Sequence, residues 1–177
     1  MPLHYPSVLL YHITEIANLP SIIQGGWLLS DARVASLAHE VIGHGHIKAR
    51  RLTELTIPCC GNRFVGEFVP FYYCPRSPML FTINQGNVGK PRGHQKEIVH
   101  LVTTVQNATG LNFPWAISDG NAGARGVLFN SEIEALDALD WGAIRTTNWA
   151  GLTRQKQAEF LVADYFPWSY IESPRFL

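Results

Sequence analysis

Short apolar runs typical of β-strands recur along this chain, and they do not alternate regularly with helical segments. β-branched and aromatic residues dominate these runs, and Pro, Gly, Asn or Asp bound them, as strands require. Strands are predicted at residues 8–13, 68–74, 97–104, 114–118 and 157–166. Pro70 lacks a ladder donor, which predicts an edge strand or a bulge for the second run. This order favours an α+β fold over a doubly wound α/β sheet.

Three helical segments are predicted between these strands. Residues 19–24 follow the candidate N-cap Asn18 and end at a Gly-Gly pair. Residues 47–52 form a second segment, with arginines in its last turn. A third is expected to begin at the N-cap Ser131, because two acidic residues follow that complement a helix dipole.

The size and the cysteines of the chain narrow the class of protein. Its 177 residues fit a single domain over 1–177 with a proper core. No apolar run is as long as a membrane span, and the N-terminus lacks the pattern of a signal peptide. Three cysteines, two of them adjacent, make a poor disulfide framework and suit a reducing compartment. A cytoplasmic protein without a membrane partner is expected.

Several common site motifs are absent from the sequence. Neither G-x-G-x-x-G nor G-x-x-x-x-G-K-[ST] occurs, which disfavours a Rossmann dehydrogenase and a P-loop nucleotidase. G-x-S-x-G is also missing, so a hydrolase nucleophile elbow has no support. His39 and His44 are five residues apart, whereas the zinc-protease motif needs a spacing of four on one helical face. No metal is therefore expected.

A carboxylate interrupts the last predicted strand. Glu159 lies within the apolar run AEFLV, residues 158–162. Burying a carboxylate costs several kcal/mol unless it is paired or hydrogen-bonded. The residues alone leave three interpretations open: an outward-facing position of an alternating strand, a structural ion-pair partner, or a catalytic group.

Two other segments carry candidate binding groups. Residues 71–80 combine aromatic rings, a proline-stiffened turn and Arg76. Rings can hold a flat base or a nicotinamide and Arg76 can contact a phosphate, but a core strand followed by a turn explains the segment equally well. His12 and Thr14 share one face of the first strand. A His there can bond to a ribose or an amide, although a structural role is commoner for a lone His.

The chain resembles the DarT family of bacterial DNA ADP-ribosyltransferase toxins in the order of seven segments: LLYHITEIANLPSIIQGGWLLS, HIKARR, FVPFYYCPRSPMLF, EIVHLV, ISDGNA, LDWGAI and RQKQAEFLV. The likeness runs from about residue 11 to 168. It implies an ADP-ribosyltransferase fold in which a split central β-sheet clasps NAD. It also implies transfer of ADP-ribose from NAD to a base in single-stranded DNA, usually thymine, and a partner antitoxin, the macrodomain protein DarG, that removes the modification.

The resemblance assigns roles to residues at matching positions. Glu159 corresponds to the family's catalytic glutamate. One arginine of the KARR segment corresponds to an arginine that holds NAD, and Arg50 is favoured over Arg51. His12 and Thr14 match the strand at the nicotinamide end.

Further expected contacts lie outside that strand. The residues expected near the nicotinamide ring are Tyr72, Tyr73 and Met79, and those expected to meet DNA are Asp119, Asn121, Arg76 and Trp115. The chain departs from the family in two places. Lys156 stands before Gln157 where members often have Arg, and members usually continue past the position of Leu177, so the chain is short at its C-terminus by comparison.

Rival functions come from two classes. A transferase acting on guanine, RNA or protein would use the same chemistry on another acceptor. A catalytically inactive module that binds NAD or nucleic acid is the other rival, and an intact Glu159 argues against it. The formal net charge of zero fits local capture of a strand better than tight non-specific binding to DNA.

Overall fold

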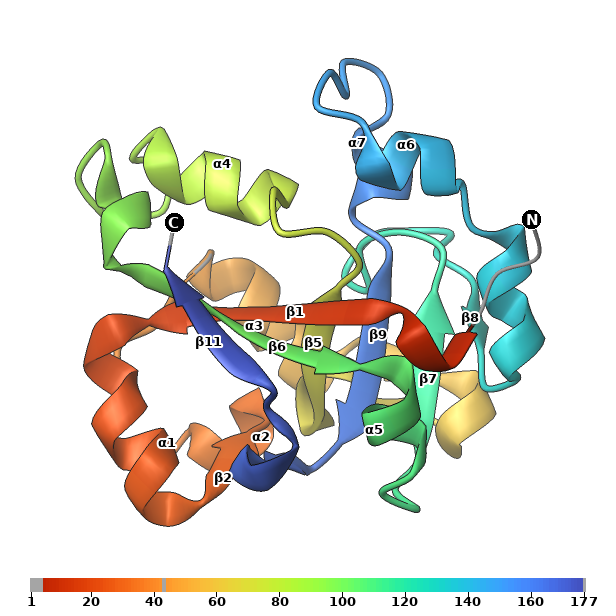
Figure 1. The fold of residues 1–177 in the computed structure, drawn as a ribbon, viewed down its shortest axis with the longest axis horizontal. Coiled ribbons are helices and arrows are strands. Elements are labelled where there is room, and N and C mark those ends of the chain that lie inside the picture. Colours follow the sequence, from red (N-terminus) through yellow and green to blue (C-terminus); the bar gives the residue numbers. More distant parts are fainter. Residues whose placement is uncertain (1–4, 43, 177) are drawn as a thin grey trace.

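The computed structural model describes residues 5–42 and 44–176. Its centre is a seven-stranded sheet whose neighbouring strands are antiparallel throughout (Figure 1). In spatial order the strands are β11 (Ser173–Phe176), β6 (Ile98–Thr104), β1 (Leu9–Glu15), β5 (Phe68–Tyr72), β9 (Glu159–Ala163), β7 (Trp115–Ser118) and β8 (Phe129–Asn130). The predicted α+β class is confirmed, because helices and strands are mixed without βαβ repeats.

The sheet is split between β1 and β5. β1 pairs with β6 along its whole length, from Leu9 opposite Thr104 to Glu15 opposite Ile98. Between β1 and β5 the only register position is Tyr11 opposite Tyr72. Beyond this point the two strands diverge, and the opening leaves room for a ligand between them.

Pro70 sits in the interior of the sheet, so the prediction of an edge strand is wrong in its simple form. β5 has neighbours on both sides, and Pro70 pairs with Leu161 of β9. On the β1 side, however, the ladder has already opened at Pro70. Because β1 no longer pairs with β5 at this position, the absent N–H of Pro70 removes no hydrogen bond of the sheet. This explains how a proline fits a central strand.

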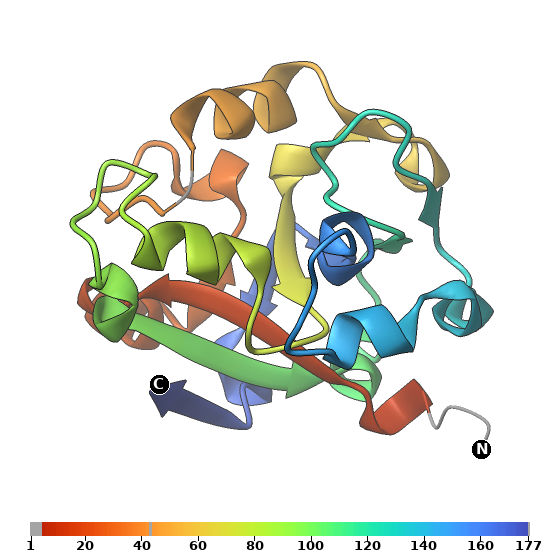
Figure 2. The same cartoon turned by 90° about the horizontal axis from the view of Figure 1, so that it is seen from above.

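Helices lie on both sides of the split. α1 (Leu19–Gly25), α2 (Asp31–Val34) and α3 (Gly45–Thr53) follow β1 in the chain, and Figure 2 shows α3 on the side of the molecule opposite β11. The helices α4 (Pro78–Asn84), α6 (Trp141–Arg145) and α7 (Thr153–Lys156) stand above β1 in Figure 1, and α5 (Val105–Thr109) follows β6. None of the described helices is long and apolar enough to cross a membrane.

The strand predicted over 157–166 is in fact two strands in different sheets. β9 ends at Ala163, and β10 (Tyr165–Pro167) pairs with β2 (Trp27–Leu29) in a small separate sheet. Asp164 between them has φ 65°, a left-handed conformation that Asp tolerates better than most residues. Its carboxylate accepts hydrogen bonds from Arg33 and Arg63, which fix the corner.

The predicted helical segments agree with the structure except in their caps. α1 and α3 cover the first two, but the side chain of Asn18 makes no capping bond and turns elsewhere. The segment after Ser131 is a 3-10 helix over Ile133–Ala138 with Glu132 as N-cap. A remaining small sheet joins β3 (Thr56–Ile57) to β4 (Arg63–Phe64).

Three phenylalanine side chains pack into the main core, among many aliphatic ones. Phe71, Phe160 and Phe166 are fully buried in one cluster, and the rings of Phe71 and Phe166 meet edge to face at 5.1 Å. Full burial of a phenylalanine stabilises a fold by about 1.5–3 kcal/mol. This packing holds β5 and β9 rigidly beside each other, so the residues at their ends keep fixed positions.

Candidate active site

A cavity of about 220 Å³ opens at the split, and it contains most of the predicted NAD-binding residues. Its walls come from β1, from α1 to α3 with their connections, and from β5 and α4. Among the residues expected from the sequence, those that line it are His12, Thr14, Arg51, Tyr72, Met79 and Asn121.

Glu159 begins β9, is completely buried, and does not line the cavity itself but adjoins two residues that do, Arg51 and Tyr72. Its Oε2 accepts a hydrogen bond from Arg51 Nη2 at 3.1 Å, and its Oε1 accepts one from the backbone N–H of Ala122 at 2.9 Å. Its own N–H donates to Ser118 Oγ at 3.1 Å. The outward-facing interpretation of Glu159 is therefore wrong. Every group of the residue is satisfied, which explains how the apolar run tolerates a carboxylate.

Arg51, not Arg50, is the arginine that meets Glu159. The Arg51 side chain is only 12% exposed, and Arg50 instead donates from Nε to Glu54 at 3.2 Å, one turn along the helix surface. Burial lowers the pKa of Arg51, but the charge of Glu159 and its hydrogen bonds outweigh burial and leave this pKa raised. Arg51 lines the cavity and Arg50 does not, so the geometry favours Arg51 over the expected Arg50. Consecutive helical residues point about 100° apart, so only one of the two can face the split.

Lys48 is a further cavity residue that the sequence analysis does not predict, although its helical spacing from Arg51 indicates a shared face. It lies three residues before Arg51 on α3, so the two side chains share a face. Lys48 Nζ donates to Asp31 Oδ1 at 2.8 Å, and both residues line the cavity. The cavity wall therefore carries two cations from one helix, a suitable arrangement for the charges of a pyrophosphate.

His12 faces the cavity as a neutral ring. Burial lowers its pKa to about 4, and the hydrogen bond with the Pro70 carbonyl opposes this only in part. Because Pro70 O accepts from Nδ1 at 2.7 Å, Nδ1 carries the proton and Nε2 is left as an acceptor. A neutral acceptor of this kind suits a ribose hydroxyl.

Tyr72 and Tyr73 point to different parts of the molecule. Tyr72 lies opposite Glu159 in the sheet and lines the cavity, and burial raises its pKa, with the charge of Glu159 adding to the effect. Tyr73 packs edge to face on Trp141 at 5.4 Å within the main core. The structure brings Tyr72 to the site and leaves Tyr73 outside the cavity.

The loop between β7 and β8, residues 119–128, contacts both Glu159 and the cavity. Asn121 lines the cavity, and its Oδ1 accepts from the N–H of Gly123 at 2.7 Å. Asp119 is half-buried and pairs with Arg154 at 2.8 Å instead of lining the cavity. The first part of this loop is thus held twice, by Arg154 at Asp119 and by the carboxylate of Glu159 at Ala122.

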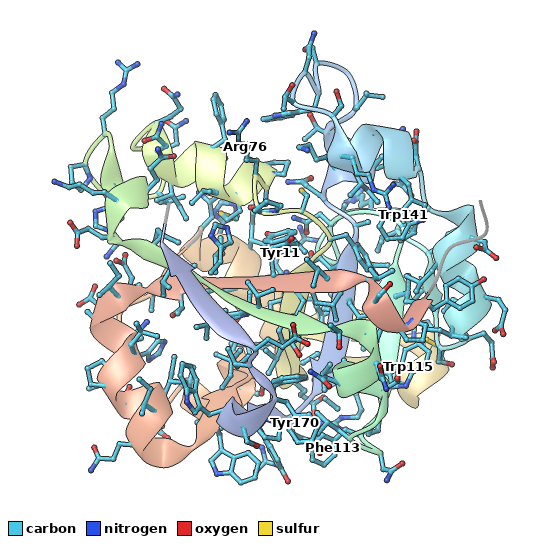
Figure 3. The ribbon with its side chains drawn as sticks, in the orientation of Figure 1. Tyr11, Arg76, Phe113, Trp115, Trp141 and Tyr170 are labelled. Atoms are coloured by element: carbon cyan, nitrogen blue, oxygen red, sulfur yellow. The ribbon has the colours of Figure 1, made fainter. Side chains whose placement is uncertain are left out.

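Arg76 and Trp115, both expected to contact DNA, lie in different places (Figure 3). Arg76 is exposed in the turn before α4, on the same side of β1 as that helix. Trp115 begins β7, at the end of that strand remote from Ser118 and Glu159, and stacks on the buried ring of Phe160 at 5.3 Å. The structure does not bring Trp115 to the cavity, so its ring serves the core.

A buried lysine fixes the turn that precedes Glu159 in the chain. Lys156 ends α7 and is 2% exposed, and its Nζ donates to the carbonyls of Ile144 and Thr146 at 2.8 Å each. Cations are stabilised at the C-terminal end of a helix, and these carbonyls belong to the end of α6. Lys156 therefore ties α6 to the turn that leads into Glu159.

The histidines considered for zinc do not assemble a metal site. His39 and His44 line the cavity, and the ring of His44 lies 5.5 Å from that of His46 at a tilt of 43°. Across residues 5–42 and 44–176, no three His, Cys, Asp or Glu side chains gather in a cluster that could hold a metal ion.

Comparison with known proteins gives a consistent result. Residues 11–173 match the family model described as "ssDNA thymidine ADP-ribosyltransferase, DarT". A DNA ADP-ribosyl transferase of Thermus aquaticus is 40% identical over 171 residues, which cover 96% of this chain and 76% of the relative.

Solved structures of the Thermus sp. 2.9 DarT superpose closely on the fold. Its complex with ADP-ribosylated single-stranded DNA has a TM-score of 0.90 at 36% identity, covering 99% of this chain and 85% of that one. Its complex with NAD+ has a TM-score of 0.85 at 33% identity, covering 99% and 84%. A Thermosipho africanus protein named as a fusion of DNA ADP-ribosyl transferase and DNA ADP-ribosyl glycohydrolase is 32% identical over 64% of this chain and 27% of its own length.

Proposed function

Since this chain belongs to the DarT family of single-stranded DNA thymidine ADP-ribosyltransferases, we propose that it transfers ADP-ribose from NAD to thymidine in single-stranded DNA. The observation that carries the proposal is the buried Glu159, held by the Ala122 N–H and by Arg51, which itself lines a cavity in the split sheet. NAD is the co-substrate, in keeping with the NAD+ complex of the Thermus sp. 2.9 relative.

The chemistry begins at the ribose of NAD. The bond between ribose C1′ and nicotinamide breaks, nicotinamide leaves with the bonding electrons, and positive charge develops on the sugar. A fixed carboxylate in a water-poor site stabilises this charge strongly, and Glu159 is preorganised for that role. A ring nitrogen of the base then bonds to C1′. Because thymine N3 carries a proton, that proton must be removed, and a carboxylate can accept it.

The assigned binding residues divide between the two substrates. Arg51 and Lys48 face the pyrophosphate, and the Nε2 of His12 accepts from a ribose hydroxyl beside Thr14. Tyr72 and Met79 lie against the nicotinamide end.

On the DNA side, Asn121 and Asp119 belong to the loop that receives the target base, and Arg76 meets the strand from the turn before α4. A base inside a duplex cannot reach a pocket of this kind, so single-stranded DNA is the substrate form.

A toxin that modifies DNA needs a partner that reverses the reaction. The Thermosipho africanus relative is named as a fusion of a DNA ADP-ribosyl transferase with a DNA ADP-ribosyl glycohydrolase, an enzyme that would remove the modification. This supports a macrodomain antitoxin of the DarG kind as the partner here. The reaction needs NAD and DNA in one compartment, so the cytoplasm is the proposed place of action.

Oligonucleotides that differ only in their bases test the acceptor. We expect mass spectrometry to show the gain of one ADP-ribose on single-stranded oligonucleotides that contain thymidine. Matched oligonucleotides with thymidine replaced, and the duplex form, should remain unmodified. Modification at guanine, or NAD consumption with an RNA or protein acceptor only, would support a rival transferase and reject thymidine as the target.

A further inference from the structure

One wall of the cavity has no secondary structure of its own. The connection from α2 to α3 lines the cavity through Leu37, Ala38, His39, Glu40, Ile42 and His44. Within the described part of the chain, no backbone–backbone hydrogen bond involves residues 38–42. A wall of this kind keeps its distance from the opposite side only if side chains hold it.

The side-chain amide of Asn18 fixes this wall through hydrogen bonds made by both its oxygen and its nitrogen. Its Oδ1 accepts from the backbone N–H of Glu40 at 2.8 Å, and its Nδ2 donates to the Glu40 carbonyl at 2.8 Å. Nδ2 also contacts Thr14 Oγ1 at 3.2 Å. The amide therefore acts as a strand would, satisfying both backbone groups of one residue while joined to β1 through Thr14. Asn18 itself lines the cavity and is 9% exposed.

A second tie to the same residue is weaker. Lys90 Nζ lies 3.0 Å from Glu40 Oε2 and 3.1 Å from Glu15 Oε1, and His94 also meets Glu15. The Glu40 side chain is 56% exposed, and ion pairs at exposed sites contribute little. Ile42 also packs against a buried cluster that includes Ile13 and Leu80. The buried amide of Asn18 is thus the stronger of the two polar attachments of this wall.

We propose that Asn18 is a positioning residue for NAD: it fixes the wall at Glu40 and so sets the width of the cavity. This inference rests on the proposed use of NAD. Asn18 acts through Glu40 and not on the reacting atoms, so its loss should weaken NAD binding and leave the chemical step nearly unchanged. It also explains why an asparagine at the N-cap position of α1 makes no capping bond.

The test compares three variants by three measurements. Asn18→Ala removes the amide, Lys90→Ala removes the weaker tie, and Asn107→Ala removes an amide that bonds Thr103 on β6, away from the cavity. Hydrogen exchange reports the Glu40 amide, calorimetry reports NAD affinity, and transfer to a thymidine oligonucleotide gives KM for NAD and kcat. If Asn18→Ala does not fold, Asn18→Asp replaces it, because the carboxylate still accepts from the Glu40 N–H.

For Asn18→Ala we expect Glu40 exchange to accelerate and the Kd and KM for NAD to rise about tenfold, the effect of losing roughly two hydrogen bonds, with kcat nearly unchanged. Lys90→Ala should change the Glu40 exchange rate and the Kd and KM for NAD by less. Asn107→Ala should leave all of these quantities unchanged. An unchanged KM despite faster exchange, or a fall in kcat without a change in KM, would overturn the proposal. Wild-type protein that binds no NAD would instead reject the proposed function itself.

Discussion

Arg51 grips the carboxylate of Glu159 with both terminal nitrogens: Nη2 lies 3.1 Å from Oε2 and Nη1 lies 3.5 Å from Oε1. The two residues are 108 positions apart in the chain and meet because the side chain of Arg51 on α3 reaches the first residue of β9. The carboxylate is fully buried and the guanidinium nearly so, a geometry in which neither charge is stable without the other.

Neighbouring arginines provide a matched test of this pair. Arg51→Ala should lower kcat/KM for transfer by about 100-fold or more, as expected when a preorganised charge is removed from an active site. It should also destabilise the fold by about 3 kcal/mol, because Glu159 would be left buried and unpaired. Arg50→Ala removes an exposed pair with Glu54 and should change neither quantity by much. Steady-state kinetics and thermal melting check both, and equal effects of the two variants would contradict the assignment.

The stability of the protein should depend on pH through His12. Its pKa is about 4 in the folded protein, against an ordinary value of 6.5, because burial disfavours the charged ring. The folded state therefore binds fewer protons than the unfolded state between these values. The stabilisation is complete above pH 6.5 and is lost as the pH falls towards 4, by up to about 3 kcal/mol.

Urea unfolding at several pH values, compared between wild type and His12→Gln, measures this term. Burial also lowers the pKa of His100, so only the difference between the two proteins isolates His12. The wild type should lose more stability than His12→Gln between pH 6.5 and 4. Parallel pH profiles would show that His12 does not titrate in this way.

Arg76 should affect DNA and not NAD. Its side chain is exposed before α4 and belongs to the proposed path of the strand. Arg76→Gln should raise KM for the oligonucleotide several-fold and leave KM for NAD unchanged. The slope of log affinity against log salt should fall by about 0.7, the value for one phosphate contact with a single strand. An unchanged slope would remove Arg76 from the DNA-binding surface.

Lys156 should matter for stability through its two carbonyl partners. Lys156→Met keeps much of the apolar length but leaves the carbonyls of Ile144 and Thr146 without their donor. A loss of about 2–3 kcal/mol in the free energy of unfolding is expected, since unsatisfied buried acceptors are costly. Chemical denaturation measures it, and a variant as stable as wild type would show that the lysine is not needed there.

Local sequence patterns predicted the main strands and the special status of Glu159. The runs around residues 8–13 and 97–104 are short and rich in β-branched residues, as is typical of strands, and the structure has β1 and β6 there. A carboxylate within AEFLV stands out because its burial would be costly without a partner, although the residues alone also allowed an outward-facing position. Such features are local, so a sequence is enough to find them.

Other features could not be predicted from the sequence, because they depend on contacts between segments that are far apart in the chain. The choice between Arg50 and Arg51 depends on how α3 is rotated against the sheet. The break at Asp164 depends on Arg33 and Arg63, which are far away in the chain. Asn18 looked like a helix cap because its partner, the Glu40 backbone, carries no pattern in the sequence.

The most direct test of the central claim is the transfer of ADP-ribose to a thymidine-containing single strand by wild type and Glu159→Gln. Glutamine keeps the size of the side chain and one acceptor oxygen but carries no charge to stabilise the developing cation. With NAD present, mass spectrometry should show the ADP-ribose adduct for wild type and none for a folded Glu159→Gln. An adduct formed at the wild-type rate by the folded variant would contradict a catalytic role for Glu159.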